Sequence, residues 1–93
     1  MGYMYNEIIV MRNEEIVNYY MAKTEFGVKY GVLVKIDGYN EIRYGFTTRT
    51  GKATKTYKTQ RGVQNWLSRN EWQQITTEFH KNQCQQLIRK LGE

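Results

Sequence analysis

Alternating side chains between Val28 and Ile36 constrain the fold of this chain most. One set of positions holds Val28, Tyr30, Val32, Val34 and Ile36, and the set between them holds Lys29, Gly31, Leu33 and Lys35. A period of two is typical of a half-buried β-strand. Asp37-Gly38 follows and predicts a tight turn, because glycine adopts the positive φ that such turns require. The returning strand is expected over Glu41–Thr48, so an antiparallel hairpin forms the centre of the predicted fold.

Three further segments are rich in the β-branched and aromatic side chains that favour strands. They are Glu7–Met11, Ile16–Thr24 and Ala53–Thr59, the last of them after a turn at Arg49–Lys52. A helix from Asn6 to Met21 stays open as the alternative for the first two, because Asn6 could cap it and three isoleucines and Tyr20 fall roughly on one side. Trp72–Thr77 is ambiguous and permits a short strand.

Helices are expected in the last third of the chain. Thr59 is a suitable N-cap, and Val63, Trp66 and Leu67 then form one apolar stripe that Asn70 can end. A last helix is expected from about Thr77 to Leu91, stopped by Gly92. Its apolar stripe consists of Phe79, Cys84, Leu87, Ile88 and Leu91.

Strands first and helices last predict a single α+β domain over residues 1–93. We expect an antiparallel β-sheet, a meander of about four to five strands, followed by C-terminal helices packed on one face. Trp66, Leu67 and the C-terminal stripe are expected to cover a sheet face that carries Tyr30, Val32, Val34, Tyr44 and Phe46.

Several classes of function lack the residues that they need. The 93 residues include one cysteine, Cys84, and one histidine, His80, so neither an internal disulfide nor a converging metal site is expected. Cys84 lies on the predicted buried stripe, where a thiol is a poor nucleophile. No carboxylate pair or glycine-rich phosphate loop stands out. We therefore expect no enzyme, no catalytic residue and no cofactor. Because the chain has no long apolar run, we also expect that it has no membrane span and no signal peptide.

Charge is the feature that points to a function. The chain has 14 Lys and Arg against 9 Asp and Glu, and residues 43–93 hold ten of the basic side chains and only three of the acidic ones. The stretch from Arg43 to Arg69 contains no acidic residue, and a segment of one sign attracts polyanions. The candidate binding residues are the cations of this stretch and a tyrosine that could stack on bases. They are Arg43, Arg49, Lys52, Lys55, Tyr57, Lys58, Arg61 and Arg69.

Two functions fit this pattern. The first is binding of nucleic acid, or of a nucleic-acid-binding protein complex, through the basic hairpin of residues 43–61. The alternative is an inhibitor or adaptor from a phage or mobile element that docks on a host protein, such as an anti-CRISPR-type nuclease inhibitor, with some of the 8 tyrosines as anchors. Abundant Tyr, Asn, Lys and Ile and the absence of proline indicate an AT-rich gene, and so a low-GC bacterium or its phage. We expect a cytoplasmic protein of the bacterial host cell, without a membrane partner, and a homodimer is one option.

Overall fold

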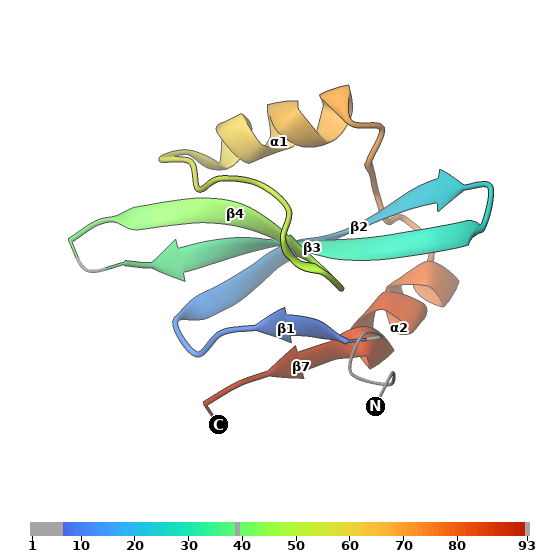
Figure 1. Cartoon of the computed structure of the whole chain (residues 1–93), viewed down its shortest axis with the longest axis horizontal. Helices are drawn as coiled ribbons and strands as arrows, with labels where there is room; N and C mark the ends of the chain where they lie inside the picture. Colours follow the sequence, from blue (N-terminus) through green and yellow to red (C-terminus); the bar gives the residue numbers. More distant parts are fainter. Residues whose placement is uncertain (1–6, 39, 93) are drawn as a thin grey trace.

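An antiparallel sheet forms the centre of the fold in a computed structural model, which describes residues 7–38 and 40–92. Within these residues the sheet has five strands in the order β5-β4-β3-β2-β6 (Figure 1). The predicted α+β class, an antiparallel sheet followed by C-terminal helices, is confirmed. The sheet consists of β2 (Glu14–Thr24), β3 (Gly27–Asp37), β4 (Ile42–Thr48), β5 (Gly51–Lys52) and β6 (Gln73–Gln74).

A helix lies on each side of this sheet, and a separate pair of strands joins one of them. The helices are α1 (Gln60–Arg69) and α2 (Glu78–Leu87). The separate strands, β1 (Ile8–Val10) and β7 (Ile88–Lys90), pair in parallel. Neither helix of the described chain is long and apolar enough to span a bilayer.

The β2–β3 hairpin settles the choice between strand and helix near the start of the chain. Residues Glu14–Thr24 are extended and pair with β3 along almost their whole length, so the strand prediction for Ile16–Thr24 is confirmed. Asn6, the cap of the alternative helix, lies outside the described residues. The hairpin turns at residues 25–26, and Gly27 follows with a φ of 125°, which glycine adopts without the penalty that a Cβ would add.

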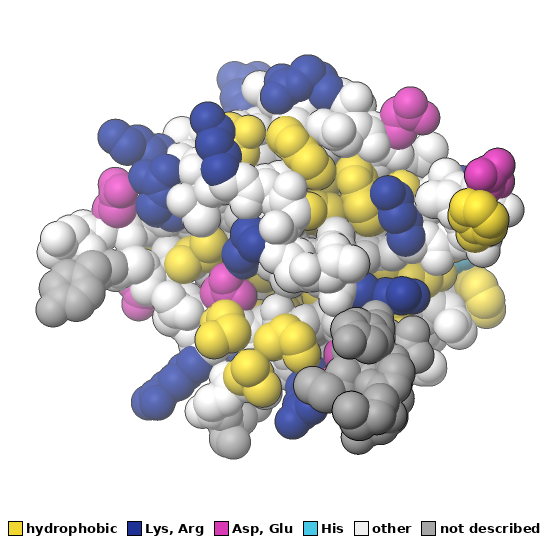
Figure 2. Space-filling view, in the orientation of Figure 1, with side chains coloured by type: hydrophobic (Ala, Val, Ile, Leu, Met, Phe, Trp, Pro, Cys, Tyr) yellow, Lys and Arg dark blue, Asp and Glu magenta, His cyan; other side chains and the backbone are white. Residues whose placement is uncertain are grey.

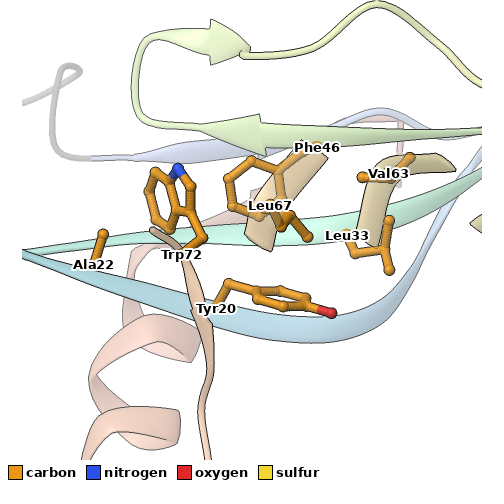
Figure 3. Packing of buried hydrophobic residues seen from close by; sticks show 7 residues of the cluster. All are labelled: Tyr20, Ala22, Leu33, Phe46, Val63, Leu67 and Trp72. Atoms are coloured by element: carbon orange, nitrogen blue, oxygen red, sulfur yellow. The ribbon is translucent and has the colours of Figure 1, made fainter. Parts of the chain in front are cut away.

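The two faces of the sheet carry separate apolar clusters, because neighbouring residues of a strand point to opposite faces. The first cluster joins the sheet to α1 (Figure 3) and consists of Tyr20, Ala22, Leu33, Phe46, Val63, Leu67 and Trp72. The second lies on the opposite face, with α2 and β1, and consists of Ile8, Val10, Val32, Val34 and Cys84.

The placement of the helices on one face is therefore corrected. Val32, Leu33 and Val34 are all fully buried, and a continuous apolar run of this kind is typical of a strand covered on both faces. Phe46 packs on the α1 side, whereas Val32 and Val34 face β1 and Cys84 of α2. The residues predicted to share one sheet face are thus divided between the two clusters on opposite faces.

The first predicted helix is confirmed as α1. The Thr59 hydroxyl accepts a hydrogen bond from the Gly62 amide at 3.2 Å, as an N-cap does, and Asn70 is the C-cap. Val63 and Leu67 are buried. Trp66 lies at the margin of the cluster and is only partly buried, and the better buried tryptophan is Trp72.

The last helix is shorter than predicted. It ends at Leu87, and Ile88–Lys90 forms β7, which pairs with β1 from the other end of the chain. The Leu91 amide also donates to the Val10 carbonyl at 2.9 Å, so strand pairing satisfies the backbone that a longer helix would have used. Cys84 is fully buried as expected, whereas Phe79 is 65 % exposed.

The predicted strand over Ala53–Thr59 is wrong. Regular pairing with β4 stops after Lys52, and beyond it only Tyr57 forms an isolated bridge, to Tyr44, within the described chain. The Thr54 hydroxyl accepts a hydrogen bond from the Phe46 amide at 3.1 Å, while the Ala53 amide donates to the Phe46 carbonyl. A side chain thus replaces part of the backbone ladder, as threonine often does at strand ends.

Candidate functional site

The structure divides the predicted basic residues into two groups, those held by a carboxylate partner within the fold and those that form no ion pair with a described carboxylate. Arg43 belongs to the first group. Its guanidinium donates to the hydroxyl and to the carbonyl of Thr56, both at 2.8 Å, and forms an ion pair with Glu41 at 2.9 Å. Arg43 therefore holds the irregular segment before α1 against β4.

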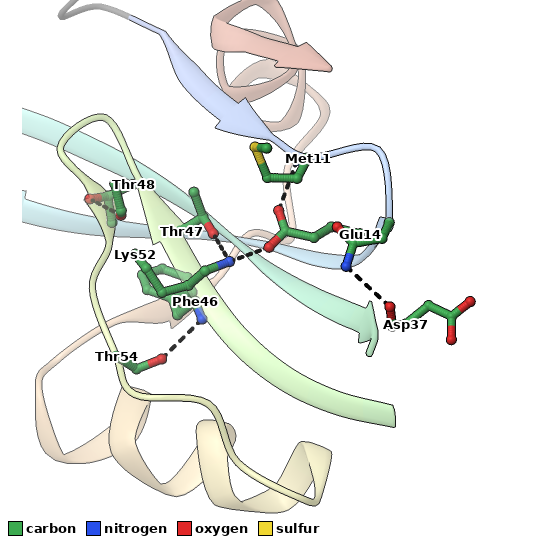
Figure 4. A network of polar contacts seen from close by, with 10 residues as sticks. Met11, Glu14, Asp37, Phe46, Thr47, Thr48, Lys52 and Thr54 are labelled. Carbon is green, nitrogen blue, oxygen red and sulfur yellow. Dashed lines mark hydrogen bonds and ion pairs between the residues drawn. The ribbon is translucent and has the colours of Figure 1, made fainter. Parts of the chain in front are cut away.

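Lys52 is also fixed within the fold (Figure 4). Its ammonium lies 2.5 Å from a carboxylate oxygen of Glu14 and donates to the Thr47 hydroxyl at 2.9 Å. The Glu14 side chain is 5 % exposed, and its other oxygen accepts from the Met11 amide at 2.8 Å. A buried carboxylate needs such partners, so the main task of Lys52 is to neutralise Glu14.

The other five predicted cations lie at the surface, on the α1 side of the sheet or at the β4–β5 turn. Among the described residues no ion pair joins any of them to a carboxylate. Figure 2 shows Lys and Arg side chains gathered over α1 and the segment that leads to it. We call these five residues the basic segment, which consists of Arg49, Lys55, Lys58, Arg61 and Arg69.

The sequence suggested that Tyr57 could stack on bases, which requires an exposed ring, but the structure buries part of this ring. It is partly buried against the first cluster, and a Cβ built on Gly62 would approach its ring to 2.7 Å, so the ring lies directly against the start of α1. The Lys55 ammonium lies 5.3 Å from the ring centroid. Tyr57 thus anchors the segment before α1, and the cation beside it remains exposed.

A pocket of about 550 Å³ opens between the β2–β3 turn, the β4–β5 turn and the end of α1. Its size falls within the range of about 300–1,000 Å³ that is usual for small-molecule sites. Of the predicted binding residues, only Arg49 lines it. The lining consists of Thr24, Phe26, Gly27, Val28, Lys29, Tyr30, Thr48, Arg49, Thr50, Ala53, Trp66, Asn70 and Trp72.

The chemistry of this pocket is aromatic and cationic. Phe26 is 92 % exposed, so nearly all of its ring is open to contact with a ligand. The Lys29 ammonium lies 4.9 Å from the centroid of the Trp72 ring, and Arg49 is a second cation of the lining. No Asp or Glu belongs to the lining among the described residues. Figure 2 shows hydrophobic side chains exposed below α1, with Lys and Arg side chains beside them.

Sequence reasoning missed most of this pocket. Lys29 was assigned to one face of a strand, and Trp72 to a segment of ambiguous structure. One signal was present: Phe26 stands in a turn beside Gly27, where polar residues are usual and a large apolar side chain has nothing to pack against. The other lining residues come together only through tertiary structure.

His80 and Cys84 do not form a common site. The Nδ1 atom of His80 is hydrogen-bonded to the Tyr30 hydroxyl at 2.9 Å, whereas the Cys84 sulfur lies 3.9 Å from the Gly31 carbonyl oxygen. Burial raises the pKa of the Cys84 thiol to about 11. Over residues 7–38 and 40–92, no three His, Cys, Asp or Glu side chains are grouped closely enough to hold a metal ion.

Comparison with known proteins gives no relative from which a function could be transferred. No protein-family model matches the chain, and searches of curated proteins and of solved structures find no match either.

Proposed function

We propose that this protein is a small non-enzymatic nucleic-acid-binding domain that acts in the cytoplasm of a bacterial cell. The observation that carries the proposal is the basic segment, five exposed cations that no carboxylate neutralises in the described structure. Cations left free in this way attract phosphates and release the counterions of a nucleic acid on binding.

Arg43 and Lys52 are not part of the proposed phosphate contacts. Both are held by partners within the fold, and their loss would disturb the structure before it changed binding. Lys55, Lys58 and Arg61 are better probes, because they lie on the surface and form no ion pair with a described carboxylate. Contacts to phosphate position a nucleic acid without reading its sequence, so we expect weak sequence preference.

The test is the salt dependence of binding to labelled DNA and RNA, measured by fluorescence anisotropy. Replacing Lys55, Lys58 and Arg61 together by glutamine should reduce the slope of log K against log salt by about two to three, because each phosphate contact contributes about 0.7–0.9. The matched control replaces Arg12, Lys35 and Lys81, which removes the same charge outside the basic segment. The control should retain most of the slope.

Two results would contradict the proposal. One is a wild-type protein that binds neither DNA nor RNA at about 50 mM salt, where phosphate contacts are strong. The other is an equal loss of slope in the two triple variants, which would mean that net charge alone, and not the basic segment, attracts the nucleic acid.

Docking on a host protein is the second candidate function, and one observation favours it. Phe26 projects almost fully exposed from a hairpin turn, as an aromatic anchor at a protein interface does. A protein partner would make the affinity depend on Phe26 and only weakly on salt. The salt series therefore separates the two candidates.

A further inference from the structure

We infer that the pocket beside the basic segment accepts an unpaired base, so that the preferred ligand is a single strand. This inference rests on the proposed function and specifies its ligand. The pocket combines exposed aromatic carbon with two cations and has no carboxylate in its described lining. That chemistry suits an aromatic ring attached to a phosphate.

Two aromatic side chains offer their surface to such a ring. Trp72 is not one of them, because Lys29 lies over its ring and Phe46 contacts the same ring at a centroid distance of 4.7 Å, so the ring is largely covered. Both Trp66 and Phe26 line the pocket; Trp66, on α1, is only partly buried, and Phe26, in the β2–β3 turn, is 92 % exposed. A base between the α1 end and the β2–β3 turn would remove both from water, which supplies the favourable energy of stacking.

The phosphates on either side of the base have cations within the same surface. Arg49 stands at the β4–β5 turn and belongs both to the pocket lining and to the basic segment. Lys29 stands on β3 within the lining. A strand whose base enters the pocket can therefore continue from Arg49 along the other cations of the basic segment.

A duplex does not satisfy this geometry. Its bases are stacked on one another and paired, so their faces are available to protein side chains only after a base has been unpaired and unstacked, which costs free energy. The bases of a single strand are free to turn toward an aromatic surface. The pocket thus favours single strands, whereas the phosphate contacts alone favour neither form strongly.

The first measurement compares three labelled ligands by anisotropy at one salt concentration: a 12-nucleotide thymidine strand, the same strand with abasic sites in place of its bases, and a duplex of equal length. The abasic strand keeps the phosphates and removes the rings. We expect it to bind about tenfold more weakly, the effect of losing one stacked base. We expect weaker binding of the duplex as well.

The second measurement uses a matched pair of variants, Phe26→Ala and Phe79→Ala. Both residues are exposed, Phe26 at the pocket and Phe79 on α2, across the sheet from α1. Because the Phe26 side chain is 92 % exposed, its removal leaves the fold intact. Phe26→Ala should weaken binding of the thymidine strand several-fold and leave binding of the abasic strand unchanged, and Phe79→Ala should affect neither.

The failures of the two proposals are distinguishable. If the intact strand, the abasic strand and the duplex bind with equal affinity and Phe26→Ala has no effect, the base pocket is refuted while phosphate binding stands. If none of the three ligands binds at about 50 mM salt, the proposed function is refuted and the base pocket with it.

Discussion

At the scale of single residues, the ion pair of Glu14 and Lys52 joins two side chains that stand 38 positions apart in the sequence. It joins the start of β2 to β5 across two other strands of the sheet (Figure 4). Lys52→Met would leave the Glu14 carboxylate buried without its cation. We expect the free energy of unfolding to fall by about 3 kcal/mol, as when one partner of a buried pair is removed.

Urea denaturation checks this value, with Lys55→Met as the control that removes an exposed lysine from the same region. The control should change stability by less than about 0.5 kcal/mol. A double variant, Glu14→Gln with Lys52→Met, should recover part of the loss because no uncompensated charge remains. A Lys52→Met variant as stable as the control would show that the pair is not needed for the fold.

Cys84 gives the second prediction at this scale, and it concerns reactivity against pH. Burial raises the pKa of the thiol to about 11, so the thiolate, which is the reactive form, stays scarce at pH 8. We expect the native protein to react slowly with an aromatic disulfide reagent at pH 8, and to react quickly once urea has unfolded it. The rate should keep rising with pH up to about 11 instead of levelling off near 9, the ordinary pKa of a thiol. Fast labelling of the folded protein at pH 8 would contradict the burial of Cys84.

At the scale of elements, the close contact between β3 and β4 depends on Gly31. A Cβ at this position would lie 2.3 Å from the Phe46 ring, which rests on the glycine within the first cluster. Gly31→Ala should therefore lower the free energy of unfolding by about 1–3 kcal/mol through overpacking. Thermal or urea unfolding measures the loss. Combining it with Phe46→Leu should give a smaller loss than the sum of the two single changes, and strict additivity would contradict the contact.

The elements also show which parts of the fold could be predicted from local sequence. The alternation around Val32 and the threonine cap at Thr59 are local signals, and β3 and α1 form where these signals place them. The strand Ile88–Lys90 has no local signal of its own, since its pattern continues that of a helix. It is extended because β1 lies beside it, and such a tertiary effect overrides local propensity.

At the scale of the whole molecule, charge and shape were not equally predictable. The excess of cations from Arg43 onward can be counted in the sequence, and five of the seven predicted cations are exposed in the structure without an ion pair to a described carboxylate. The pocket cannot be deduced from the sequence, because Phe26, Arg49 and Trp66 stand on three segments that meet only in the folded chain. The sequence therefore indicated the charge of the proposed ligand, and the fold was needed to locate the pocket proposed to hold its aromatic part.

The parallel pairing of β1 with β7 can form only after the chain has been synthesised as far as Lys90. Ile8 pairs with Ile88, so this contact closes a loop of nearly the whole described chain. The cluster under α1 uses residues no later than Trp72 and can assemble earlier. Until the last helix and β7 have left the ribosome, Ile8, Val10, Val32 and Val34 lack the cover of Cys84. A nascent chain of this protein therefore exposes one apolar sheet face until α2 and β7 have emerged, and during that interval the exposed face carries a risk of aggregation.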